Sequence, residues 1–60
     1  MKFKDLKQGD YFYCDIGNDP LVRCIKTKPI ESIDGFSINA VNLSNGDFLY
    51  VGIYVEVVEA

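Results

Sequence analysis

The stretch FSINAVNLSNGDFLYVGIYVEVV (residues 36–58) consists of two alternating apolar segments that meet at Asn45-Gly46. An Asn-Gly pair between alternating apolar runs is the strongest short-range signal for a β-hairpin, because a type I′ turn needs a positive φ at both central residues. We therefore predict a hairpin with a two-residue turn at this position. The expected cross-strand pairs are Leu43 with Phe48, Asn42 with Leu49, Val41 with Tyr50, Ala40 with Val51, and Ile38 with Ile53.

Both faces of this hairpin are apolar in the predicted register. A strand pair with one solvated face needs apolar residues on only one side. We therefore expect the hairpin to form the centre of a small closed or sandwiched sheet. One face would carry Val41, Leu43, Phe48 and Tyr50, and the other would carry Ile38, Ala40, Val51 and Ile53.

The length of the chain predicts one domain with a thin stability margin. A domain of 60 residues buries only about 60% of the surface that its unfolded chain exposes. The 48% hydrophobic content and the eight aromatic side chains place the sequence among globular proteins. Self-association or partner binding would therefore add usefully to stability.

A first hairpin is expected before this stretch. Residues 11–16 (YFYCDI) and 21–28 have the composition and alternation of strands, and the cluster Gly17-Asn18-Asp19-Pro20 is typical of a turn. Two registers fit. We prefer the one that pairs Phe12 with Ile25, Cys14 with Arg23 and Tyr11 with Lys26, because it gathers apolar residues on one side. A turn longer by one residue would instead place Cys14 opposite Cys24.

The remaining segments connect these hairpins. The i, i+3 spacing of Phe3 and Leu6 indicates one helical or 3₁₀ turn that anchors the N-terminus, and Gly9-Asp10 indicates a turn into the first strand. Residues 29–35 (PIESIDG) are expected to form a loop, because proline removes a ladder donor. Gly52 marks a bend, after which the chain forms a fifth strand or the bent end of the fourth.

The opening residues 3–12, read as F-x-D-L-x-x-G-D-x-F, and the segment Asn39-Ala40-Val41-Asn42-Leu43 before Gly46 resemble small uncharacterised proteins of bacteria and their phages with an SH3-like barrel. The resemblance implies a small five-stranded all-β barrel over residues 1–60, built from two hairpins and a C-terminal strand. It also implies a bacterial or phage setting. It transfers no catalytic residue.

The distribution of charge and the composition limit the classes of ligand and the cellular locations that we expect. The net charge is −3, but residues 1–28 carry all six basic groups and residues 29–60 carry five acids and no base. An acidic chain is a poor ligand for nucleic acid. No apolar run approaches the length of a membrane span, and no signal-peptide pattern is present. We expect a cytoplasmic protein, in the host cytoplasm if a phage encodes it, with Cys14 and Cys24 as reduced thiols.

Catalysis and metal binding are not expected. The chain has no histidine, so it offers no Ser-His or Cys-His pair. Asp15, Asn18 and Asp19 lie close together but lack the spacing of a calcium loop, and two cysteines without histidine fall short of a zinc site. We predict no enzyme activity, no cofactor and no metal.

The chain has more aromatic side chains than its core needs, and this is the feature that indicates a function. If Phe12, Phe36 and Phe48 fill the barrel, several tyrosines project outward, and tyrosine is enriched at interface hot spots. We predict a protein-binding module, with a protein partner or a second copy of the chain. The candidate partner-binding residues are Tyr11, Tyr13, Arg23, Lys26, Tyr54 and Glu56.

Two versions of the binding function remain open at this point. The acids of the second half would suit a basic partner surface, such as that of a host protein that a phage-type inhibitor modulates. The alternative is single-stranded nucleic acid, bound by Tyr11 and Tyr13 together with Arg23, Lys26 and Lys28. The acids of the second half are Glu31, Asp34, Asp47, Glu56 and Glu59.

Overall fold

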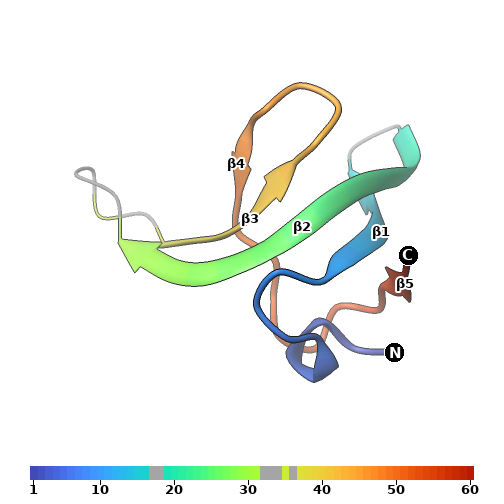
Figure 1. The fold of residues 1–60 in the computed structure, drawn as a ribbon, viewed down its shortest axis with the longest axis horizontal. Helices are drawn as coiled ribbons and strands as arrows, with labels where there is room; N and C mark the ends of the chain where they lie inside the picture. The colour runs from blue at the N-terminus through green and yellow to red at the C-terminus, as the bar shows by residue number, and fades with distance from the viewer. Residues whose placement is uncertain (17–18, 32–34, 36) are drawn as a thin grey trace.

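The computed structural model describes residues 1–16, 19–31, 35 and 37–60. They form one antiparallel sheet of five strands in the order β4-β3-β2-β1-β5, so the all-β class is confirmed (Figure 1). The sheet is open, with β4 and β5 at its two edges, and in this respect it differs from the predicted closed barrel. The elements are η1 (Phe3–Asp5), β1 (Tyr11–Ile16), β2 (Asp19–Glu31), β3 (Ser37–Asn42), β4 (Phe48–Leu49) and β5 (Val58–Glu59).

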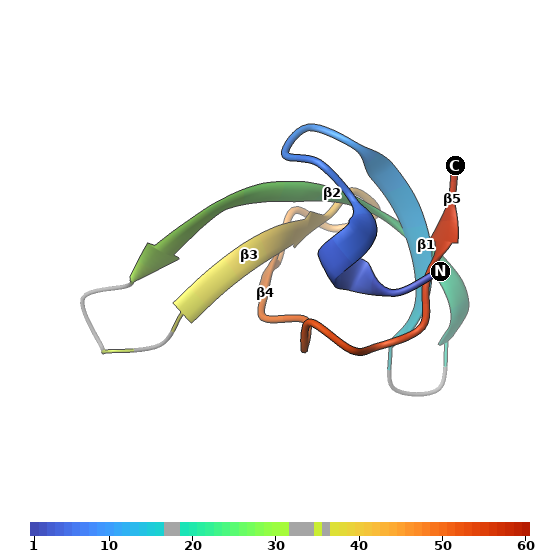
Figure 2. The same cartoon turned by 90° about the horizontal axis from the view of Figure 1, so that it is seen from below.

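The sheet bends into an arch. Figure 2 shows β2 spanning the top of the arch, with η1 inside it and the segment 50–57 crossing its open side from β4 to β5. We call the side of the sheet that faces η1 the inner face and the opposite side the outer face. The predicted helical turn at the N-terminus is confirmed as η1, and it lies against the inner face.

The core lies between the inner face and the segments that cover it. Phe12 is fully buried, and its ring meets the ring of Phe3 edge to face with 5.4 Å between centroids. Small side chains on the neighbouring strands, such as Cys24 and Ala40, leave room for the residues of the N-terminal turn. The buried cluster consists of Phe3, Leu6, Phe12, Cys14, Cys24, Ala40, Val51 and Val57.

Backbone and side-chain hydrogen bonds hold the N-terminal segment in place. The N–H groups of Phe3 and Lys4 donate to the carbonyls of Val55 and Ile53. From the sheet, Lys26 Nζ donates to the carbonyl oxygens of Phe3 at 3.0 Å and Leu6 at 2.7 Å. The lysine therefore binds carbonyls at both ends of η1, at its first residue Phe3 and at Leu6 just after it, and holds the turn against the sheet.

The register of the first hairpin differs from both predicted registers. Tyr11 pairs with Ile25 and Tyr13 pairs with Arg23, while Phe12 lies opposite Cys24. Ile16 pairs with Asp19, after an irregularity that begins at Cys14. The strands therefore pair one position earlier than expected up to Cys14, and beyond it Ile16 lies opposite Asp19 in place of Leu21. Residues 17–18 of the predicted turn lie outside the described residues. As a result, Tyr11 and Ile25 share the outer face, whereas Phe12 and Cys24 share the inner face.

The prediction of a loop from Pro29 onward is wrong for its first three residues, 29–31. β2 continues to Glu31 and pairs with β3 beyond the proline, because Ile30 lies opposite Ile38. The register shifts between Lys26 and Ile30, so Pro29 lies at an irregularity of the ladder. A bulge is one of the few places where a strand tolerates proline. Residues 32–34 of the predicted loop lie outside the described residues.

The hairpin at Asn45-Gly46 forms, but its turn is longer than predicted. Val41 pairs with Phe48 and Ala40 pairs with Leu49, a shift of two residues from the expected register. In the loop, Gly46 has a φ of +79°, whereas Asn45 has no positive φ, so the type I′ turn is absent. Asn45 Oδ1 instead accepts the N–H of Asp47 at 2.9 Å. A shift of two residues leaves each side chain on its predicted face.

The prediction that this hairpin forms the centre of the sheet is wrong. It lies at an edge, because β4 is the last strand, and β2 occupies the centre. Phe48, which was expected in the core, is 70% exposed, and Leu43 and Tyr50 are also exposed. Phe36, also expected in the core, lies outside the described residues. The bend at Gly52 is confirmed as a turn in which Val55 N–H donates to Gly52 O, and β5 is a separate strand beside β1.

Candidate functional site

The outer face carries a continuous row of apolar side chains across four strands. The register places Tyr11 of β1 beside Ile25 of β2, Ile25 beside Val41 of β3, and Val41 beside Phe48 of β4. Side chains at directly opposed positions of neighbouring strands stand on the same face, about 5 Å apart. The four residues therefore form a row that runs perpendicular to the strands.

A second row lies beside the first. Val58 of β5 pairs with Tyr13 of β1, and Tyr13 pairs with Arg23 of β2. The row continues to Leu43, whose N–H donates to the carbonyl of Arg23 at 3.0 Å. We call the two rows together the outer patch. Its members are Tyr11, Tyr13, Arg23, Ile25, Val41, Leu43, Phe48 and Val58.

The members of the outer patch are accessible to solvent. Phe48 is 70% exposed, Val58 is 56% exposed, and Tyr11 and Leu43 are each 44% exposed. Tyr13, Ile25 and Val41 are half-buried between them. Single exposed apolar residues are common on protein surfaces, whereas a contiguous exposed apolar patch is often functional. The outer patch is therefore the main candidate site of the described residues.

Arg23 is the one charged member of the outer patch. Its guanidinium lies over the ring of Tyr11, 4.9 Å from the centroid, and the side chain is exposed. Within residues 1–16, 19–31, 35 and 37–60, no carboxylate lies within 4.0 Å of it. A guanidinium stacked on an aromatic ring provides a planar cation that remains available to a binding partner.

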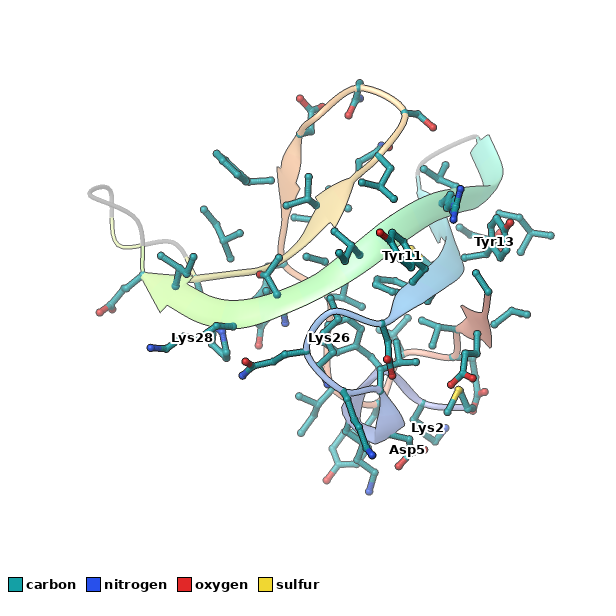
Figure 3. The ribbon with its side chains drawn as sticks, in the orientation of Figure 1. Lys2, Asp5, Tyr11, Tyr13, Lys26 and Lys28 are labelled. Carbon is teal, nitrogen blue, oxygen red and sulfur yellow. The ribbon has the colours of Figure 1, made fainter. Side chains whose placement is uncertain are left out.

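The structure brings together three of the six predicted partner-binding residues. Tyr11, Tyr13 and Arg23 are neighbours in the outer patch. Lys26 lies two residues after Cys24 on β2 and therefore on the same, inner face of the sheet. Its ammonium lies 4.5 Å from the ring centroid of Phe3. The predicted pairing of Tyr11 with Lys26 is therefore wrong. Figure 3 shows Lys28 farther along β2, away from Tyr13.

Tyr54 and Glu56, the other two predicted residues, lie in the segment that crosses the open side of the arch. Lys4 Nζ lies 5.2 Å from the ring centroid of Tyr54. Glu56 bonds to Lys2 Nζ at 2.6 Å and to the N-terminal ammonium at 3.3 Å. The hydrogen bond from Lys2 is the main cause that lowers the pKa of the Glu56 carboxyl. These two residues thus join the two ends of the chain.

Sequence reasoning missed Ile25, Val41, Leu43, Phe48 and Val58 as members of the site. The apolar character of both hairpin faces was the available signal, and it was interpreted as burial on both sides. In the structure the inner face carries Ala40, Leu49 and the buried amide of Asn42, while Val41, Leu43 and Phe48 point outward. Alternation reveals which residues share a face but does not reveal which face is buried.

The two cysteines form a buried pair beneath the inner face. Their sulfur atoms are 4.0 Å apart, and they are not joined by a disulfide. Burial raises the pKa of the Cys14 thiol above its ordinary value and raises that of Cys24 to about 12. Both groups are therefore protonated thiols at neutral pH, and a thiol in this state is a weak nucleophile and a weak metal ligand.

Two small hollows open beside Cys14 and Asp15. One, of about 260 Å³, lies between the end of β1 and the segment from Leu49 to Gly52. The other, of about 280 Å³, lies between β1 and the N- and C-terminal segments. Both are smaller than the pockets of roughly 300–1,000 Å³ that bind small molecules. Among the residues that the structure covers, no three side chains of the metal-binding types cluster together.

Compared with protein-family models, with curated proteins and with solved structures, the chain shows no significant match to any of them. Among the described residues, no helix has the length and apolar character that crossing a bilayer requires.

Proposed function

We propose that this chain is a small non-enzymatic protein-binding module and that the outer patch is its binding surface. The row formed by Tyr11, Ile25, Val41 and Phe48 is the observation that carries the proposal. Aromatic and arginine side chains supply most of the binding energy in protein interfaces. In the outer patch, Tyr13 and Arg23 lie beside the aliphatic Ile25 and Val41 in the middle, and Phe48 lies at the border.

A protein partner fits the outer patch better than nucleic acid does. Affinity for nucleic acid comes largely from neutralised phosphates, and each contact needs a cation. Arg23 is the only cation of the outer patch, because the ammonium of Lys26 is bonded to the carbonyls of Phe3 and Leu6. The tyrosines and Arg23 alone give a stacking surface with one phosphate contact, which is weak support for the nucleic-acid alternative.

The fold and setting implied by the resemblance are part of this proposal. We infer that the sheet is an open form of an SH3-like barrel, which the curved β2 and the return of β5 to β1 support. A modulator of a host protein in the bacterial cytoplasm is the corresponding role. The acids expected to face a basic partner lie apart, with Glu31 at the end of β2, Asp47 in the loop before β4 and Glu59 in β5. Binding through the outer patch therefore does not depend on them.

An affinity experiment with matched variants tests the proposed surface. The tagged chain, Phe48→Asp and Tyr54→Asp are each incubated with a bacterial lysate that has been treated with nuclease, and the retained material is identified. Phe48 and Tyr54 are similarly exposed, at 70% and 66%, but only Phe48 belongs to the outer patch. We expect the original chain and Tyr54→Asp to retain the same protein and Phe48→Asp to lose at least about tenfold of it.

Two results would contradict the proposal. Equal retention of the partner by all three chains would exclude the outer patch as the binding surface. Binding of a fluorescent single-stranded oligonucleotide at about 50 mM salt, with an affinity that falls as salt is raised, would favour the nucleic-acid alternative instead.

A further inference from the structure

We propose that the outer patch is self-complementary and that a second copy of this chain binds it face to face in a weak symmetric dimer. The inference rests on the proposed function because both use the same surface. Here the molecule that binds the outer patch is a second copy of the chain. A binding partner of another kind would compete with the second copy for the outer patch.

The shape of the outer patch suits sheet-on-sheet packing. Its members come from all five strands and form two adjacent rows of side chains. Two sheets pack through such faces at a separation of about 10 Å, with the side chains of one face between those of the other. The protruding ring of Phe48 at the border and the half-buried Ile25 and Val41 in the middle give the relief that such packing needs.

The charges of the outer patch permit a second copy to approach. The chain has a net charge of −3, but none of the acids belongs to the outer patch. Two copies that meet there keep their carboxylates outside the centre of the interface, where salt screens them over about 8 Å. Arg23 already stacks on Tyr11, and the tyrosine rings of the second copy offer the guanidinium a second aromatic surface.

The area of the outer patch predicts a weak dimer. Strands about 4.8 Å apart and residue rows about 7 Å apart give a face of roughly 300 Å² in plan. With the relief of the side chains, two copies would bury on the order of 1,000 Å² in total, which is the lower limit for a specific interface. We therefore expect a dissociation constant in the micromolar range, with monomer and dimer in exchange.

Sedimentation velocity from about 5 to 500 µM tests the inference. The original chain is expected to shift from monomer to dimer as concentration rises. Phe48→Asp in β4 and Leu43→Asp in the turn after β3 are each expected to weaken the dimer at least about tenfold, because they bury a charge in the interface. Tyr54→Asp is expected to dimerise like the original chain. Circular dichroism confirms that each variant is folded.

A chain that remains monomeric at the highest concentration would overturn the inference, and so would unchanged dimerisation of both folded outer-patch variants. Loss of dimerisation in Tyr54→Asp alone would also overturn it, by assigning the interface to the open side of the arch. These outcomes are distinct from failure of the proposed function. A monomeric chain that still loses its protein partner on Phe48→Asp would exclude the dimer and leave the proposed function intact.

Discussion

Replacement of Phe12 by alanine is expected to remove a large part of the free energy of unfolding. Phe12 is 0% exposed and packs edge to face on Phe3, so the substitution leaves a cavity at the centre of the core. Truncation of a buried phenylalanine costs about 3–5 kcal/mol. A domain of 60 residues has a total stability of roughly 3–9 kcal/mol, so the loss removes from about a third of it to all of it. Urea unfolding followed by circular dichroism measures the effect.

The same substitution at Phe48 is the matched control. Phe48 is 70% exposed, so Phe48→Ala is expected to change the free energy of unfolding by no more than about 0.5 kcal/mol. The measurement is made at a concentration below the dissociation constant that sedimentation gives, where the chain is mostly monomeric. If Phe48→Ala destabilises the protein as much as Phe12→Ala does, the assignment of the inner and outer faces is wrong.

Replacement of Asn39 by alanine is expected to cost about 2–4 kcal/mol of stability. The buried amide of Asn39 donates to the carbonyl of Val51 and accepts the N–H of Val51, both at 2.8 Å. The ladder between β3 and β4 has ended at this point. The side chain of Asn39 makes the two hydrogen bonds to the Val51 backbone that a neighbouring strand would otherwise make. Alanine leaves two backbone groups of Val51 buried without partners, which carries the full cost of their desolvation. Thermal unfolding of the variant checks the result.

Asn39→Asp separates the hydrogen bonds from the shape of the side chain. The carboxylate keeps an acceptor for the Val51 N–H, but it has no proton to donate to the Val51 carbonyl. The variant should therefore be destabilised at pH 7 and recover part of the loss as the pH falls toward 4, because burial beside the Val51 carbonyl raises the pKa of the new carboxyl above its unfolded value. Stability of Asn39→Ala within about 0.5 kcal/mol of the original chain would show that Val51 does not depend on this amide.

The elements that local signals specify were predicted well. β1 spans the predicted residues, because the Gly9-Asp10 turn precedes a run of aromatic and β-branched side chains. The N-terminal turn forms where Phe3 and Leu6 share one side, and both residues are buried. In these segments, the turn residues and the apolar spacing indicate the same structure, and tertiary packing agrees with them.

The registers could not be predicted, because they depend on hydrogen bonds that compete with the expected turn. At the second hairpin, the side chain of Asn42 accepts the N–H of Ser44 at 2.8 Å, and Asn45 bonds to Asp47 in the same way. Asparagine forms such local bonds readily, and here they favour a four-residue loop over the type I′ turn. At the first hairpin, an irregularity after Cys14 shifts the pairing by one residue, and no residue type in the sequence marks it.

The composition of the candidate site was predicted only in part for a related reason. Tyr11, Tyr13 and Arg23, three of the proposed residues, are neighbours in the outer patch, although the predicted register had placed Arg23 opposite Cys14 on the other face. The orientation of Lys26 follows from the position of η1, whose carbonyls it reaches across the inner face. Such a contact between segments 20 or more residues apart has no local signature. The same holds for the exposure of Phe48, which depends on which face η1 covers.

The pairing of the outer-patch residues is the central claim, and nuclear Overhauser contacts between backbone protons of neighbouring strands test it most directly. We predict contacts between Tyr11 and Ile25 and between Val41 and Phe48, as the register requires. Contacts between Phe12 and Ile25 and between Val41 and Tyr50 would contradict it. In that case, Tyr11, Ile25, Val41 and Phe48 would not form one exposed row, and neither the proposed binding surface nor the dimer would stand.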